Sequence, residues 1–203
     1  GRPQGTQVVE RQVESVSIDV PFSALEKSPP GGALGDDMQE IAGKVVFITG
    51  GASGIGLAMA RVFAKAGAKL AIADLREDHL AEASEELKNA GAEVVPFCLN
   101  VTDRAAMAAA AEETERVYGK VHILCNNAGV NIIRPVDEAT FEDFDWLISV
   151  NLGGVINGLL TFIPRIKAHG EGGHIVNTSS VAGIVAEPGT GIYSATKFAI
   201  RGL

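Results

Sequence analysis

The sequence predicts an α/β fold, a doubly wound parallel sheet with helices on both faces. Short apolar, β-branched stretches alternate along the chain with longer stretches whose apolar residues recur at helical spacing. The short stretches are continuously apolar, which is typical of strands that are buried on both faces. Each pair of successive strands is joined by a helix, and such crossovers are right-handed and place the strands parallel.

Five strands are expected from the apolar stretches. The first is the run Val45-Val46-Phe47-Ile48, which ends at a group of glycines, and the second ends in the acidic residue Asp74. The expected strands are residues 45–48, 69–74, 93–99, 121–125 and 175–178. Cys98 and Cys125 fall inside two of them and are expected to act as small buried hydrophobic residues.

Five helices are expected between and after these strands. Gly67 and Gly91 stand where glycine commonly ends a helix, and Asp103 can cap the amino end of the third. Thr140 and Asp143 resemble a capping box that opens a long fourth helix. The expected helices, caps included, are residues 57–66, 77–90, 103–118, 140–163 and 191–203.

Composition and charge exclude several classes of protein. The chain has 203 residues, 46% hydrophobic and 21% charged, which is typical of a folded domain. With 25 acidic and 17 basic residues its net charge is −8, so it lacks the clustered basic charge that nucleic acid or an anionic membrane attracts. The longest apolar runs fall short of the about 20 residues that span a bilayer. Neither nucleic acid nor a membrane is therefore an expected partner.

The two cysteines make no disulfide framework, and no secretory signal opens the chain, so we expect a cytoplasmic protein. Residues 1–37 hold four of the eight prolines and little apolar sequence. We expect them to be a flexible N-terminal extension, with Met38 as the natural start. Residues 38–203 are expected to form one folded domain.

The turn after the first strand is suited to a pyrophosphate. It reads Thr49-Gly50-Gly51-Ala52-Ser53-Gly54-Ile55-Gly56 and leads directly into a helix. A dinucleotide site of the Rossmann type needs glycine for a tight turn, for close approach of the backbone to phosphate and for helix-on-strand packing. Gly50, Gly54 and Gly56 can fill these positions. The helix amino terminus that follows offers free N–H groups to the anion, and Ser53 and Ile55 of the turn are also expected to bind the cofactor.

Asp74 ends the second strand, where an acid binds the adenosine ribose of a dinucleotide. The same carboxylate repels a 2′-phosphate, so NAD is the expected cofactor and NADP is less favoured. Arg76, two residues further on, could soften that repulsion.

Tyr193 and Lys197 lie four residues apart, so they share one face of the last expected helix. A phenol is a poor base at neutral pH, and a nearby ammonium favours its phenolate form. A tyrosine and a lysine at this spacing are also common on helix surfaces, so the neighbouring residues must decide whether the pair is functional. Ser180 follows the fifth strand and Asn127 follows the fourth, at the edge where ligands bind in open α/β sheets. Asn151 interrupts an apolar stretch, where an amide is costly unless it is hydrogen-bonded.

Taken together, these motifs resemble those of the short-chain dehydrogenases/reductases. The matching features are the turn at 49–56, Asp74, Asn126-Asn127-Ala128-Gly129, Asn151, Ser180 and Tyr193-x3-Lys197. The resemblance covers roughly residues 38–203, so these are expected to form one dinucleotide-binding Rossmann domain that also carries the catalytic residues. It is specific to the family but not to a substrate.

The resemblance implies a Ser-Tyr-Lys mechanism on an alcohol or carbonyl substrate. Tyr193 would be the general acid/base, Lys197 would favour its phenolate and bind the nicotinamide ribose, and Ser180 would polarise the reacting oxygen. Asn151 would hold a water that relays protons to Lys197. Asn127, Ala128 and Gly129 would line the cofactor cleft. The resemblance also implies a homo-oligomer, a dimer or a tetramer, with the helix that carries Asn151 at the subunit interface.

The chain departs from the family pattern in two places. Asn100-Val101 stands where the family usually has Asp-Val against the adenine, and Asn100 can still accept a hydrogen bond there. The sequence also ends at Leu203, inside the helix that carries Tyr193 and Lys197, so we expect a C-terminally truncated domain.

Two functions stay open on the sequence alone. One is an NAD-linked oxidoreductase, and the alternative is a dinucleotide-binding protein or inactive fragment that lacks the C-terminal substrate lid. No metal site is expected, because His79, His122, His169 and His174 show no metal-ligand spacing. Neither Ser179 nor Ser180 stands in the Gly-x-Ser-x-Gly turn of a hydrolase.

Overall fold

The computed structural model describes residues 41–203, which form a five-stranded parallel sheet in the order β3-β2-β1-β4-β5. The strands are β1 (Val45–Thr49), β2 (Lys69–Asp74), β3 (Val94–Cys98), β4 (Ile123–Asn126) and β5 (His174–Asn177). The doubly wound parallel sheet expected from the sequence is confirmed. The predictions for residues 1–37 and for Met38 lie outside the described residues.

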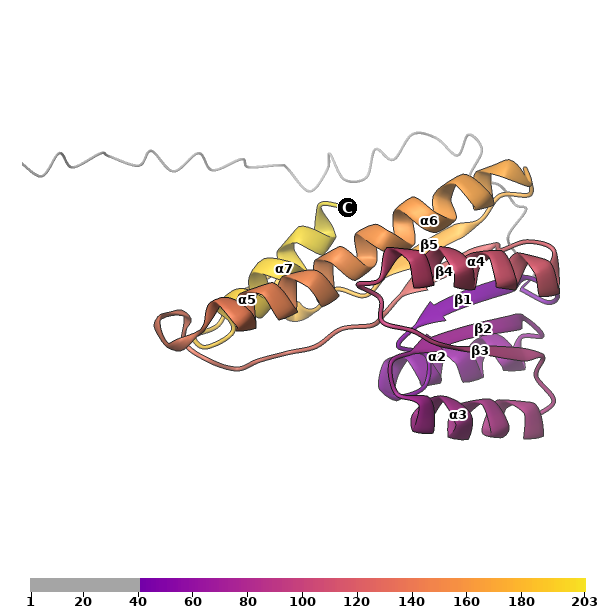
Figure 1. Ribbon diagram of the computed structural model, residues 1–203, viewed down its shortest axis with the longest axis horizontal. Helices are drawn as coiled ribbons and strands as arrows, with labels where there is room; N and C mark the ends of the chain where they lie inside the picture. Colours follow the sequence, from indigo (N-terminus) through magenta and orange to yellow (C-terminus); the bar gives the residue numbers. More distant parts are fainter. Residues whose placement is uncertain (1–40) are drawn as a thin grey trace, which may run out of the picture. The chain divides into compact units, whose positions relative to one another are not determined.

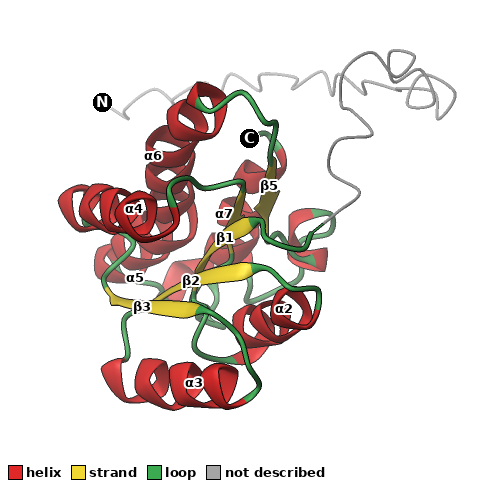
Figure 2. Ribbon diagram, turned by 90° about the vertical axis from the view of Figure 1, so that its right-hand side faces the viewer, coloured by secondary structure: helices red, strands yellow, loops and turns green. Residues whose placement is uncertain are grey.

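The helices lie in two layers, as Figures 1 and 2 show. Helices α2 (Gly54–Lys65) and α3 (Glu77–Asn89) cover one face, and α4 (Arg104–Tyr118) and α6 (Gly154–Ala168) cover the other. Each layer has its own core. Ile48 and Ile72 pack with Leu80 and Leu87 on the first face, and Phe47 packs with Met107 and Phe162 on the second. Side chains of the central strand β1 point alternately into the two cores, so the strand is buried on both faces.

The capping signals in the sequence are confirmed. The Asp103 carboxylate accepts the N–H groups of Ala105 and Ala106 at 2.9 and 3.0 Å, which begins α4. The capping box joins Thr140 and Asp143, each side chain accepting the other's backbone N–H at 3.2 and 3.0 Å. It opens α5 (Phe141–Leu147). These caps satisfy N–H groups that have no partner inside a helix.

The two edge strands are less buried than expected. Residues His174, Ile175 and Val176 of β5 are exposed, and β3 alternates between covered and open positions. Cys98 at the end of β3 is exposed, so the expectation that it is a buried hydrophobic residue is wrong. Cys125 in the central strand β4 is buried as expected, and burial raises the pKa of its thiol to about 12. The difference arises because β3 has a neighbouring strand on one side only.

Helix α5, a π-helical segment (Ile148–Gly153) and α6 form one continuous helix of 28 residues, Phe141–Ala168. By length and composition alone it could cross a bilayer, which the sequence analysis did not expect. Its apolar surface divides between core and solvent: Phe162 packs on the sheet, whereas Leu160 is 73% exposed. Its buried amides, Asn151 and Asn157, bond within the domain, the Asn157 amide donating to the Val101 carbonyl at 2.9 Å. This is the pattern of a helix that helps to form a globular core.

The long helix also runs five residues beyond the expected end, through Pro164. The last helix, α7 (Gly191–Arg201), begins where expected and packs against α5 and the short turn Val181–Gly183.

Candidate active site

A cleft of about 770 Å³ lies at the carboxyl ends of the strands. It opens where β1 lies between β2 and β4, the point at which the strand order reverses and open α/β sheets bind ligands. The sequence-predicted residues that line it are Gly50, Ser53, Gly54, Ile55, Asp74, Asn100, Val101, Asn127, Ala128, Gly129, Ser180, Tyr193 and Lys197. Gly56 and Asn151 do not line it and contribute from behind its wall.

The turn after β1 keeps its backbone close to its neighbours. Gly50 adopts a φ of +63°, which favours glycine. A Cβ on Gly56 would lie 1.9 Å from the Gly50 carbonyl oxygen, so only glycine lets α2 begin this close to the strand. Ser53 caps α2 by position but makes no side-chain capping bond, and Gly54 faces open space. The first N–H groups of α2 are therefore available to an anion, and the turn fits a dinucleotide pyrophosphate.

Asp74 is held in place at the end of β2 by two backbone bonds. Its Oδ2 accepts the N–H of Ala52 at 3.2 Å, and its Oδ1 accepts the N–H of Arg76 at 3.1 Å. The carboxylate therefore joins the glycine-rich turn to the start of α3. It lines the cleft beside Gly50, where a ribose attached to a pyrophosphate on that turn would lie.

The residues after β4 are tied to the ends of two other strands. The Thr49 hydroxyl at the end of β1 accepts the N–H groups of Asn127 and Ala128 at 3.0 and 3.1 Å. The Asn127 side chain donates to the Gly50 carbonyl at 3.3 Å and accepts the Thr178 hydroxyl at 3.3 Å. This role of Thr49 was not predicted from the sequence. The sequence did contain a signal for it, because Thr49 places a hydroxyl group at the last position of a buried strand.

Asn151 fixes the chain beyond Gly129. Its Oδ1 accepts the N–H of Val130 at 2.8 Å, and its Nδ2 donates to the Val130 carbonyl at 2.9 Å and to the Thr196 hydroxyl at 3.2 Å. The π-helical segment that carries Asn151 is a local widening of the helix of the kind found at functional sites. Val130 and Thr196 were not predicted, because nothing in the sequence shows that this amide joins the wall of the cleft to α7.

Tyr193 and Lys197 share one face of α7, as their spacing predicts. The Lys197 Nζ lies 5.7 Å from the centroid of the Tyr193 ring and donates to the Thr178 carbonyl at 2.8 Å. Lys197 is buried, and this desolvation lowers the pKa of its ammonium from the ordinary value. Thr178 therefore holds the ammonium near the phenol, a role that the sequence analysis did not assign to it.

Two serines follow β5 and have different contacts. The Ser179 hydroxyl donates to the Lys197 carbonyl at 3.0 Å and thereby joins the end of the sheet to α7. Ser180 accepts the N–H of Ala182 at 3.2 Å and lines the cleft with Tyr193. A hydroxyl, a phenol and an ammonium thus face one cleft, which can position an alcohol or carbonyl oxygen and exchange a proton with it.

Asn100 lies at the other end of the cleft, after β3. Its side-chain oxygen accepts the N–H of Thr102 at 3.0 Å, which shapes the loop that leads into α4. Val101 behind it is buried against the second core. Both residues line the cleft near Asp74, on the side where an adenine would extend from the ribose.

The chain is similar in sequence to known proteins. Residues 44–203 match the sequence profile of a family described as short chain dehydrogenase. The C alpha-dehydrogenase of Sphingobium sp. strain SYK-6 is 47% identical over 163 residues, which are 80% of this chain and 53% of the relative. The chain therefore spans about half the length of this curated relative.

Solved structures show the same relationship. The apo form of LigO from Sphingobium sp. strain SYK-6 is 51% identical with a TM-score of 0.80, over 81% of this chain and 62% of that one. A short-chain dehydrogenase/reductase from Burkholderia phymatum, solved in complex with NAD, is 42% identical with a TM-score of 0.80, over 81% and 59% of the two chains. Sequence, fold and cleft agree that the chain belongs to the short-chain dehydrogenase/reductase family of Rossmann-fold oxidoreductases.

Proposed function

We propose that the protein transfers a hydride between NAD(H) and an alcohol or carbonyl substrate by a Ser-Tyr-Lys mechanism. The observation that carries the proposal is the continuity of one cleft, which runs from Asp74 and the glycine-rich turn to Ser180, Tyr193 and Lys197. A dinucleotide with its adenosine end at Asp74 would extend toward these three side chains. The NAD complex of the related Burkholderia phymatum protein supports NAD as the cofactor.

The bound nicotinamide supplies or accepts the hydride, and the protein supplies position and proton transfer. Ser180 donates a hydrogen bond to the reacting oxygen and orients it toward Tyr193. The Tyr193 hydroxyl gives its proton to a carbonyl oxygen, or takes one from an alcohol. Lys197, held by the Thr178 carbonyl, stabilises the phenolate form by its charge. Asn151, Val130 and Thr196 keep α7 in register with the wall of the cleft.

The division of roles among these residues predicts different effects of two substitutions. Lys197→Met removes the charge that stabilises the phenolate, so the basic limb of the pH–rate profile should move to higher pH and NAD binding should weaken. Ser180→Ala should reduce turnover by about 10²-fold or more, because a preorganised donor to the reacting oxygen is lost. It should leave the basic limb nearly in place. Steady-state rates across pH, with NAD and a panel of secondary alcohols and ketones, give both readouts.

An equal shift of the basic limb in both variants would contradict the division of roles. NAD binding without turnover on any alcohol or carbonyl compound would instead favour the alternative, a dinucleotide-binding protein without catalysis. We also propose a homo-oligomer, a dimer or a tetramer, in which the exposed apolar residues of α5 and α6, Phe141 and Leu160 among them, form the contact.

A further inference from the structure

Four charged residues, Asp74, Arg76, Glu77 and Asp78, lie where β2 leads into α3. Asp74 ends the strand, Arg76 precedes the first residue of the helix, and Asp78 lies in the first turn. The Arg76 backbone N–H bonds to the Asp74 carboxylate, so the arginine is attached to the residue that would meet the ribose. An arginine in this neighbourhood is the group that recognises the 2′-phosphate of NADP in dinucleotide-binding folds. The chain therefore places a potential NADP-binding group next to an NAD-type carboxylate.

The side chain of Arg76 bonds to Asp78 and not to Asp74. Its Nε donates to Asp78 Oδ1 at 3.0 Å and its Nη2 donates to Asp78 Oδ2 at 2.5 Å. This is the two-point geometry that makes arginine–carboxylate pairs directional. The arginine hydrogen bonds hold the pKa of the Asp78 carboxyl well below its ordinary value, and they raise the pKa of Arg76. Both groups are exposed, so an incoming anion can compete for the guanidinium.

We propose that Asp78 is a specificity-determining residue that favours NAD by keeping the Arg76 guanidinium away from the position of a 2′-phosphate. The inference rests on the proposed dinucleotide function and adds a second carboxylate to it. Asp74 repels a 2′-phosphate directly, whereas Asp78 acts through Arg76. A phosphate bound at Asp74 would have to break a two-point ion pair before it gained the arginine.

Asp78 also carries negative charge at a helix amino terminus, where any acid is favourable. Glu77 separates that general effect from the proposed one. It has the same charge in the same turn of α3. Among the described residues, however, Arg76 forms its ion pair with Asp78 and not with Glu77. Glu77→Gln is therefore the matched control for Asp78→Asn.

The test is isothermal titration calorimetry of the chain with NAD⁺ and with NADP⁺, which needs no turnover. The unaltered protein should bind NAD⁺ more tightly. Asp78→Asn releases Arg76, and the NADP⁺ affinity should rise by about 5- to 10-fold relative to the NAD⁺ affinity, the scale of one exposed charge-assisted contact. Glu77→Gln and Asp78→Glu should keep the original ratio. Adding Arg76→Gln to Asp78→Asn should remove the gain.

Three outcomes would overturn the inference, and they are distinguishable from one another. Unchanged selectivity in Asp78→Asn, with NAD⁺ still bound, would remove the role of Asp78 and leave the proposed function intact. An equal gain in Glu77→Gln would show a general charge effect. An unaltered chain that binds neither NAD⁺ nor NADP⁺ would overturn the proposed function and this inference with it.

Discussion

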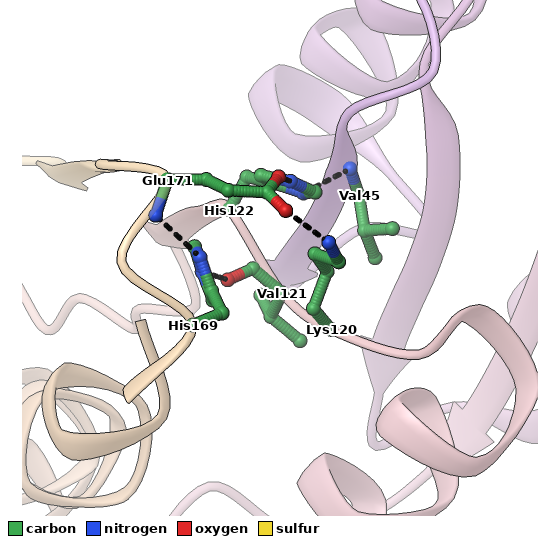
Figure 3. A network of polar contacts seen from close by, with 6 residues as sticks. All are labelled: Val45, Lys120, Val121, His122, His169 and Glu171. Carbon is green, nitrogen blue, oxygen red and sulfur yellow. Dashed lines mark hydrogen bonds and ion pairs between the residues drawn. The ribbon is translucent and has the colours of Figure 1, made fainter. Parts of the chain in front are cut away.

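His122, directly before β4, is a buried histidine whose two ring nitrogens bond to Val45 and Glu171 (Figure 3). Its Nδ1 accepts the N–H of Val45 at 3.0 Å, so its Nε2 carries the proton and donates to Glu171 at 3.1 Å. Glu171 also pairs with Lys120. The centroids of the His169 and His122 rings are 5.1 Å apart. The His169 Nε2 donates to the Val121 carbonyl. Protonating His122 would set an N–H against the N–H of Val45, inside a buried site.

This geometry predicts a pH dependence of stability. Burial is the main cause that lowers the pKa of His122 below the ordinary value of about 6.5; the nearby charges of Lys44 and His169 add to it, and Glu171 opposes it. Below about pH 6.5, His122 therefore binds more protons in the unfolded chain than in the folded one. The free energy of unfolding should decrease as the pH is lowered. A second loss should follow below about pH 4.5, since hydrogen bonds from Lys120 and His122 lower the pKa of Glu171 to about 2.

Urea unfolding between pH 7 and pH 5 measures the first effect. His122→Gln should flatten the slope, because its side chain no longer titrates in this range. His79→Gln, a change at a half-buried histidine of α3 outside this network, should leave the slope as it is. A slope that survives His122→Gln would contradict the assignment.

At the scale of elements, the approach of α6 to β4 depends on one glycine. A Cβ on Gly158 would lie 2.1 Å from the Asn126 Oδ1, a buried oxygen without a hydrogen-bond partner among the described residues. Asn126 cannot move freely, because its amide donates to the Asn177 side chain of β5 at 2.9 Å. Gly158 therefore allows close packing of helix and strand, behind the segment that forms the wall of the cleft.

Gly158→Ala should lower the free energy of unfolding by about 1–3 kcal/mol, the usual cost of overpacking a core. Gly153→Ala is the control in the same long helix, since its added Cβ would be 3.7 Å from the nearest atom. Alanine is the better helix former by about 1 kcal/mol, so this variant should be neutral or more stable. Chemical denaturation of the two variants makes the comparison. Equal stability of both variants would contradict the packing argument.

The sequence predicted elements well where the signal was local. Asp103, Thr140, Gly67 and Gly91 marked helix ends, and each marks a helix end in the structure. The π-helical widening at Asn151 was not predicted, because it depends on bonds to Val130 and Thr196, which are 21 and 45 residues away. The exposure of Cys98 was missed for a similar reason. The order of the strands in the sheet decides which strands lie at its edges, and this order cannot be deduced from the pattern of apolar residues.

At the scale of the whole molecule, the candidate site follows from topology. The predicted cofactor and catalytic residues come from the five strand ends, the start of α2, the π-helical segment and α7, and most of them line one cleft because all five strands are parallel. The residue types and their spacing were therefore enough to indicate the cleft. The bonds that fix it were not predictable, since Thr49, Thr178 and Val130 act through tertiary contacts. Their contacts are with Asn127, Lys197 and Asn151, on other elements.

We propose that this cleft binds NAD and that Tyr193 transfers the proton. The most direct measurement compares the unaltered protein with Tyr193→Phe in two assays, calorimetric binding of NAD⁺ and turnover of secondary alcohols and ketones in both directions. Phenylalanine keeps the ring and its packing but removes the exchangeable proton. We expect NAD⁺ binding to survive while turnover falls by about 10²–10⁴-fold. Full turnover in Tyr193→Phe, across these substrates and in both directions, would contradict it.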